Sequence, residues 1–378
     1  MTSLSCRPIE CFRPYHFGAV GYPFAINSIV ELWKYTECMH DGFGIEGPLD
    51  HFILANFLQN GFTEEEFSHI AAIKVAIDDL GATIGRPCQY PTHALFYALN
   101  HARHIRVLAP PGSLVLELGA GSGYLGALLV LMGYRYVASD IAQAFYLLQS
   151  HLLQRVAPLG CLDLLDERLG PDDLRALRPG QAAVVPWWRW VRREFPYALS
   201  LDVVTSNHNL LEMHPFSRLY HLSVVRDRLT ENAVGLVFEG WGDPSKTPTW
   251  MAVQALEQKG FVLAHSDRRI NCFTLARSPH AREGVLRYPL PLPPSPDPGV
   301  NPYELHYAVP EFNDPRNPLS KAILGMRAHE SARNSRGMED YRKLMGRVDL
   351  ATEDERFLAY IFQDTPAARP WVAASPSK

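Results

Sequence analysis

The feature that most constrains the fold is a short glycine-rich segment that follows an apolar run. Residues 114–118 read Leu-Val-Leu-Glu-Leu and are followed by Gly119, Gly121 and Gly123, and then by an apolar stretch that suits a helix. Glycine adopts backbone conformations closed to other residues and lets a ligand approach the main chain. The N-terminus of the following helix offers backbone N–H groups and partial positive charge. The segment therefore predicts a strand, a ligand-binding turn and a helix in succession.

Apolar runs that alternate with helical stretches continue this pattern as far as about residue 277. We predict strands over 114–118, 136–139, 202–206, 235–239, 261–265 and 272–276. Strands separated by helices indicate right-handed crossovers and a mainly parallel sheet. The last two runs are separated only by 266–271, which is too short for a helical crossover, so they should pair antiparallel.

Two nucleotide-binding loops are compatible with the glycines. Gly121, Gly123 and Gly126 satisfy the Gly-x-Gly-x-x-Gly pattern of nicotinamide-binding domains. Glu117 argues against that alternative, because a carboxylate in the strand would repel a pyrophosphate but suits a cationic, amino-acid-like ligand. The antiparallel last strand also argues against it. A nicotinamide-dependent oxidoreductase is therefore a remote alternative.

The run Glu117-Leu-Gly-Ala-Gly-Ser-Gly123 resembles the first motif of class I S-adenosylmethionine (SAM)-dependent methyltransferases. The resemblance covers about 114–277. It implies an α/β, Rossmann-like fold with a seven-stranded, mainly parallel sheet and an antiparallel last strand. SAM is the implied cofactor: the acidic glycine loop holds its methionine part, and an acid ending the second strand holds its ribose hydroxyls. The implied cofactor-binding residues are Glu117, Gly119, Gly121, Gly123 and Asp140, the last expected on the surface of a cleft.

An unusual insertion precedes the 202–206 strand. It contains Trp187-Trp188-Arg189-Trp190 at the place where the family has an adenine-facing loop. Trp187 is our candidate to stack on adenine, with a cation–π contribution from Arg189. Packing of these tryptophans against outer helices is an equally good interpretation.

Polar residues follow the 202–206 strand at its carboxyl end, where ligands of open parallel sheets bind. Asn207 is assigned to the cofactor site. His208 is the leading candidate for the base that takes a proton from an attacking hydroxyl, because histidine titrates near neutral pH. Glu212 and His214 are candidates to orient His208 or to replace it. A purely structural role in the strand-to-helix turn is the alternative for all of them.

This cluster resembles, more loosely, a segment of sugar and small-molecule O-methyltransferases, which implies O-methylation of a small molecule in secondary metabolism. Two alternatives stay open. The enzyme could close the aminobutyrate group of SAM to azetidine-2-carboxylate and release methylthioadenosine, or the chain could be a non-catalytic subunit of the same fold.

The chain divides into three zones that differ in composition and in predicted secondary structure. We predict a helical N-terminal cap or lid over 1–110, the SAM-binding domain over 111–280, and a proline-rich linker with a helical extension over 281–378. Thr63 and Glu66 form a capping-box pattern for a helix that should stop at Gly81. A further charged helical stretch is expected over 319–345.

Composition excludes several other classes. The net charge is −4, from 36 basic and 40 acidic residues, which gives no reason to expect nucleic acid or a membrane as a partner. Apolar runs are too short to span a bilayer. The six cysteines lack the paired spacing of a zinc site, so we expect no metal and free thiols in the cytoplasm. Homodimerisation through the C-terminal zone is left open.

Overall fold

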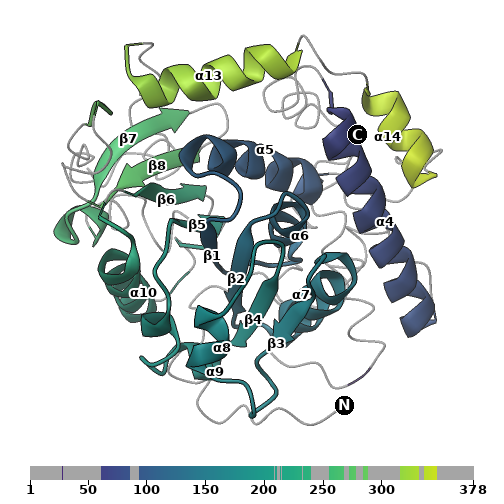
Figure 1. The fold of residues 1–378 in the computed structure, drawn as a ribbon, viewed down its shortest axis with the longest axis horizontal. Coiled ribbons are helices and arrows are strands. Elements are labelled where there is room, and N and C mark those ends of the chain that lie inside the picture. Colours follow the sequence, from purple (N-terminus) through teal and green to yellow (C-terminus); the bar gives the residue numbers. More distant parts are fainter. Residues whose placement is uncertain are drawn as a thin grey trace, which may run out of the picture.

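A mainly parallel sheet forms the centre of the molecule (Figure 1). The computed structural model describes residues 61–85, 93–207, 209–210, 213, 215–231, 233–239, 255–267, 272–277, 284–287, 316–331 and 336–346, together with Ser28. The strands are β1 (Leu114–Leu118), β2 (Arg135–Asp140), β3 (Cys161–Asp163), β4 (Ala182–Pro186), β5 (Val203–Asn207), β6 (Val234–Glu239), β7 (Val262–Asp267) and β8 (Cys272–Ala276). They lie in the order β3-β4-β2-β1-β5-β6-β8-β7.

The sheet confirms the Rossmann-like prediction and corrects one number. Neighbouring strands are parallel from β3 to β6, whereas β8 runs antiparallel to both β6 and β7. The described strands number eight rather than the seven expected. The sequence prediction overlooked both β3 and β4. Three half-buried residues make up β3 at the edge of the sheet, which is too short for a recognisable hydrophobic pattern.

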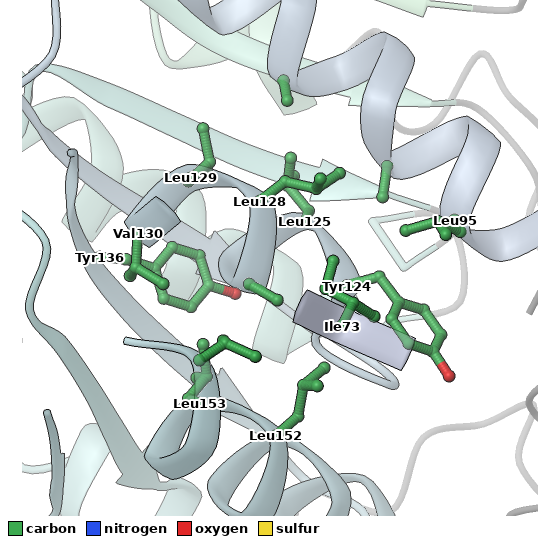
Figure 2. Packing of buried hydrophobic residues seen from close by; sticks show 14 of the residues in the cluster. Ile73, Leu95, Tyr124, Leu125, Leu128, Leu129, Val130, Tyr136, Leu152 and Leu153 are labelled. Carbon is green, nitrogen blue, oxygen red and sulfur yellow. The ribbon is translucent and has the colours of Figure 1, made fainter. Parts of the chain in front are cut away.

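Helices cover both faces of the sheet. They are α4 (Glu64–Ile84), α5 (His93–Leu108), α6 (Tyr124–Leu131), α7 (Gln143–Val156), α8 (Pro171–Arg175), α9 (Trp187–Trp190), α10 (Pro215–Arg228), α13 (Pro318–Ser331) and α14 (Met338–Met345), with a 3₁₀ turn η2 (Pro196–Ala198). Helices α4 to α7 share one core with Val115 and Tyr136, as Figure 2 shows around α6. The other core joins Leu116 to α10 and to the segments around α8 and α9. All five residues of β1 are therefore buried.

The capping box at the start of α4 is confirmed. Thr63 Oγ1 accepts a hydrogen bond from the Glu66 backbone, and the Glu66 carboxylate accepts one from the Thr63 backbone. The predicted end at Gly81 is wrong, because the helix continues to Ile84 and stops at Gly85, whose φ of 77° forms a left-handed cap. Glycine inside a helix is tolerated when packing supports the turns around it, whereas a left-handed cap favours glycine strongly.

The C-terminal zone contributes two helices that pack onto the rest. Helix α13 lies near α5 and β7, and α14 lies near α4. The predicted helical stretch over 319–345 thus contains α13 and α14, each described separately. None of the helices in the described ranges has the length and apolar character that crossing a membrane requires. The boundaries of the three predicted zones stay a prediction.

Candidate functional site

The glycine loop 119–123 joins β1 to α6 at the carboxyl end of the parallel strands. Gly119, Gly121 and Gly123 have φ angles of 70°, 54° and 81°. A Cβ atom at Gly121 would meet no described atom within 4 Å, so the loop is open on that side. No side chain caps α6 at Gly123. The loop therefore presents an accessible main chain beside a helix N-terminus, which suits a polar ligand.

The segment after β5 packs onto this loop. Asn209 donates a hydrogen bond from Nδ2 to the Leu118 carbonyl oxygen over 3.1 Å. A Cβ atom at Gly119 would lie 2.0 Å from the same Nδ2, so only glycine leaves room for Asn209. The connection that carries the predicted substrate-side residues thus begins in direct contact with the glycine loop.

Asp140 ends β2, as predicted, but it is buried rather than on the surface of a cleft, with 7% of the residue exposed. Its Oδ1 accepts a hydrogen bond from the Ala142 backbone over 2.9 Å, and its Oδ2 accepts one from Gly121 over 3.0 Å. Burial raises the pKa of this carboxyl to about 6, while N–H groups of Ala142, Gly121 and Ile141 act in the opposite direction. Asp140 therefore ties the glycine loop to the end of β2 and keeps acceptor positions on both oxygens.

Glu117 is buried at the end of β1, with 3% of the residue exposed. The Tyr136 hydroxyl donates to its Oε2 over 2.5 Å, and Asn207 Nδ2 donates to its Oε1 over 3.2 Å. Burial raises the pKa of Glu117 to about 8; both hydrogen bonds lower it, and the nearby Asp140 raises it further. Two carboxyl groups thus lie at the same end of the sheet, each held by hydrogen-bond donors.

The sequence prediction missed Tyr136 and Thr205 as members of the site. Tyr136 lies on β2 with no exposed surface, and Thr205 donates to Asn207 Oδ1 over 3.2 Å. The signal that could have identified them is Glu117 itself, because a buried carboxyl needs hydrogen-bond donors from neighbouring strands. Asn207 bonds to Thr205 and Glu117 within the protein, and its predicted contact with the cofactor stays a prediction.

The tryptophan insertion forms α9 directly after β4. Pro186, the last residue of β4, is the register partner of Asp140, so Trp187 follows close to the end of β2. Trp187 is 6% exposed and packs edge-on against Trp188, with ring centroids 6.0 Å apart. Arg189 donates to backbone carbonyls of the 164–169 segment and lies over the Phe195 ring. Its guanidinium therefore holds that segment, and the adenine contact of Trp187 stays a prediction.

The three candidate catalytic side chains, His208, Glu212 and His214, lie outside the described residues. Their neighbours Asn209 and Met213 are described, and Asn209 fixes the start of the connection against the glycine loop. The assignment of the base therefore stays a prediction, based on its place after β5.

The donor and acceptor chemistry of the site fits SAM. A buried carboxyl at Glu117 suits the ammonium group of an amino acid, and the two oxygens of Asp140 suit vicinal hydroxyls. The open side of Gly121 leaves space for the ligand next to the main chain.

Comparison with known proteins finds solved structures that are distantly similar to this chain. No family model and no curated protein match the chain. Among solved structures, magnesium protoporphyrin IX methyltransferase from Synechocystis PCC 6803 with bound SAH is 12% identical, with 70% of this chain and 98% of that chain covered and a TM-score of 0.34. A TehB-like SAM-dependent methyltransferase from Corynebacterium glutamicum is 15% identical, with 52% and 91% covered and a TM-score of 0.32.

A third structure is CalS10 with bound SAM, an amino pentose methyltransferase of calicheamicin biosynthesis from Micromonospora echinaspora. It is 18% identical, with 41% of this chain and 53% of that chain covered and a TM-score of 0.28. With TM-scores below 0.5, these likenesses carry no argument about this chain. The fold rests on the strand order and on the antiparallel β8.

Proposed function

We propose that this protein is a SAM-dependent methyltransferase that acts on a small molecule, with oxygen as the methyl acceptor. The observation that supports it most is the pair of buried carboxyl groups, Glu117 and Asp140, on either side of an open glycine loop. An ammonium group and vicinal hydroxyls in one ligand would satisfy both. A dinucleotide could also use Asp140 for its ribose, but it would place its pyrophosphate near the Glu117 carboxyl.

When bound, SAM supplies a methyl group on a positively charged sulfur. The protein's own residues bind and orient it: Glu117 takes the ammonium group, Asp140 takes the ribose hydroxyls, and Trp187 faces the adenine. His208 accepts the proton of the attacking hydroxyl, with Glu212 or His214 as orienting or replacing groups. Alignment of the acceptor oxygen with the methyl carbon supplies much of the rate acceleration.

The test is to incubate the purified protein with methyl-labelled SAM and a small-molecule extract of the producing cells. We expect label in a new small-molecule product, and a large loss of that product with His208→Gln. His151→Gln is the matched control, because His151 lies on α7 and faces Asp79 of α4, 3.5 Å away. It should leave product formation unchanged.

The position of the label separates the alternatives. Label found only in methylthioadenosine, formed without any acceptor, would contradict methyl transfer and favour intramolecular cyclisation of SAM. Stabilisation of the protein by NAD(H) and indifference to SAM would contradict both and favour an oxidoreductase.

A further inference from the structure

A chain of side-chain hydrogen bonds crosses three adjacent strands beneath the glycine loop. Thr205 of β5 donates to Asn207 of the same strand, Asn207 donates to Glu117 of β1, and Tyr136 of β2 donates to the other oxygen of Glu117. Strand β1 lies between β2 and β5 in the sheet. Glu117 is therefore the shared acceptor of donors that arrive from both neighbouring strands.

Both donors are fixed in orientation. The Tyr136 ring lies against α6 so closely that a Cβ atom at Gly126 would come within 2.3 Å of its Cε1 atom. Thr205 donates to the oxygen of the Asn207 amide, which turns the amide nitrogen toward Glu117. The Glu117 carboxyl is thus held in one position by groups that cannot easily turn away.

The acceptor capacity of Glu117 is only partly used. An ionised carboxylate offers about four lone-pair positions, and the donors from Tyr136 and Asn207 occupy one on each oxygen. A buried carboxylate is most stable when a cationic donor approaches it. The remaining positions therefore suit a ligand ammonium group.

We propose that Tyr136 and Asn207 are positioning residues that hold Glu117 for the ammonium group of SAM, and that binding of this cation expels one proton from Glu117. The proposal rests on the proposed function, because it takes SAM as the ligand. It assigns two further residues to the SAM site and couples SAM binding to the release of one proton. The glycine-loop motif implies neither.

The surroundings of Glu117 explain why it holds a proton before the ligand binds. On β2 the titratable groups near Glu117 are Tyr136 and Asp140, and Asp140 raises the pKa of Glu117, as burial does. Arg135, the first residue of β2, lies at the other end of the strand, where it faces Asp202. On β5 the facing side chains, Thr205 and Asn207, are neutral. Helix α6, packed over this side, has Tyr124 as its one titratable residue. No cation faces the carboxyl among these groups, so its pKa of about 8 leaves it protonated near neutrality.

The experiment is calorimetric titration of SAM in buffers of different ionisation enthalpy, which counts protons exchanged on binding. At about pH 6.5, Glu117 is protonated and the ligand's own amino group, with a pKa of about 7.7–8.0, keeps its charge. We expect wild-type protein to release about one proton for each SAM that binds. Below the pKa of Glu117, the affinity for SAM should rise about tenfold for each unit by which the pH is raised. Glu117→Gln should release at most the roughly one quarter of a proton that Asp140 holds at this pH, and it should lose most of this pH dependence.

Ligand analogues locate the cation. S-adenosylhomocysteine retains the amino acid part but lacks the sulfonium charge, so it should release the same proton. Methylthioadenosine lacks the amino acid part but keeps the ribose, so it should release at most the fraction of a proton that Asp140 holds. Release of about one full proton with methylthioadenosine, or SAM binding by wild-type protein without proton release, would overturn the proposal.

A double-mutant comparison tests whether Tyr136 acts through Glu117. Tyr136→Phe should weaken SAM binding at least about tenfold in the wild-type background, since it removes a hydrogen bond to a charged group. In the Glu117→Gln background the same change should have less than about a threefold effect. Equal losses in both backgrounds would show a purely structural role and overturn the positioning claim. Wild-type protein that binds no SAM at all would refute the proposed function instead.

Discussion

At the scale of single residues, the site depends on where side chains are missing as much as on where they are present. Gly119 leaves room for Asn209, Gly121 leaves room for a ligand, and Gly126 leaves room for the Tyr136 ring. Gly126, which completes the nicotinamide-type glycine pattern, therefore has a packing explanation. Sequence spacing could identify these glycines, but it could not show which neighbour each of them admits.

Gly126→Ala tests the contact between α6 and Tyr136. The added methyl would lie 2.3 Å from Cε1 of the fully buried ring, so one of the two must shift. Overpacking of this kind costs about 1–3 kcal/mol of unfolding free energy. Gly325→Ala is the control, because Gly325 lies in α13 with nothing within 4 Å of its added Cβ. Alanine there should stabilise the helix by up to about 1 kcal/mol.

Denaturant unfolding of both variants provides the measurement. A Gly126→Ala protein as stable as the wild type would mean that Tyr136 does not lie against α6. The hydrogen bond that positions Glu117 would then lose its structural support.

At the scale of elements, the strongly apolar strands were predictable and the short ones were not. The bounds predicted for β1 and β8 agree with the structure, because both are compact apolar runs. β3 has three residues, and β4 runs directly into the tryptophans of α9, so no turn residue marks its end. The hydrogen-bond network around Glu117 was also beyond sequence reasoning, since it depends on the lateral order of β2, β1 and β5.

Helices α4 and α5 are joined by a buried ion pair. Arg103 donates to both oxygens of Glu66 over 2.7 Å and to the Gly61 carbonyl over 3.0 Å. Arg103→Leu would leave a buried carboxylate without its cation, which costs about 3–5 kcal/mol of unfolding free energy. Arg155→Leu is the matched control, because Arg155 pairs with Asp79 between α7 and α4 but both side chains are largely exposed. It should cost less than about 1 kcal/mol.

Chemical unfolding compares the unfolding free energies of the two variants, and one outcome would contradict this expectation. If Arg103→Leu and Arg155→Leu destabilise the protein equally, the Glu66–Arg103 pair is not buried as described. The double variant Glu66→Leu with Arg103→Leu should recover part of the loss, because no unpaired charge then remains although the capping-box bond to the Thr63 backbone is lost.

At the scale of the whole molecule, residues from different zones predicted from composition contact one another. The extension carries Asn317, which has no exposed surface and donates to the Ala264 carbonyl of β7 over 2.7 Å. Phe62, just before α4, pairs with Arg336, just before α14. The zones were distinguished by local composition, whereas these contacts join residues more than fifty positions apart in the chain.

The buried carboxyls make stability depend on pH. In the folded state, burial raises the pKa of Glu117 from 4.5 to about 8 and that of Asp140 from 3.8 to about 6. For an acid with a raised pKa, the favourable contribution is present below the unfolded pKa and is lost as pH rises. Between about pH 6 and pH 7, unfolding releases the Glu117 proton, so this group lowers the unfolding free energy by about 1.4 kcal/mol per pH unit.

Urea unfolding of the ligand-free protein at these two pH values checks this expectation. Glu117→Gln has no carboxyl to titrate, so its unfolding free energy should fall less steeply with pH than that of the wild type. Equal pH dependence in the two proteins would mean that Glu117 does not hold a proton in the folded state.

The measurement that tests the central claim most directly is calorimetric titration of SAM into wild-type, Asp140→Asn and Asp202→Asn proteins. Asp202 is the matched control: it accepts a hydrogen bond from the Leu114 backbone over 2.8 Å, at the opposite end of the sheet. Asp140→Asn should weaken SAM binding at least about tenfold, since a charge-assisted bond contributes about 1.5–3 kcal/mol. Asp202→Asn should leave the affinity within about twofold. Wild-type affinity in a folded Asp140→Asn protein would contradict the assignment of this site to SAM.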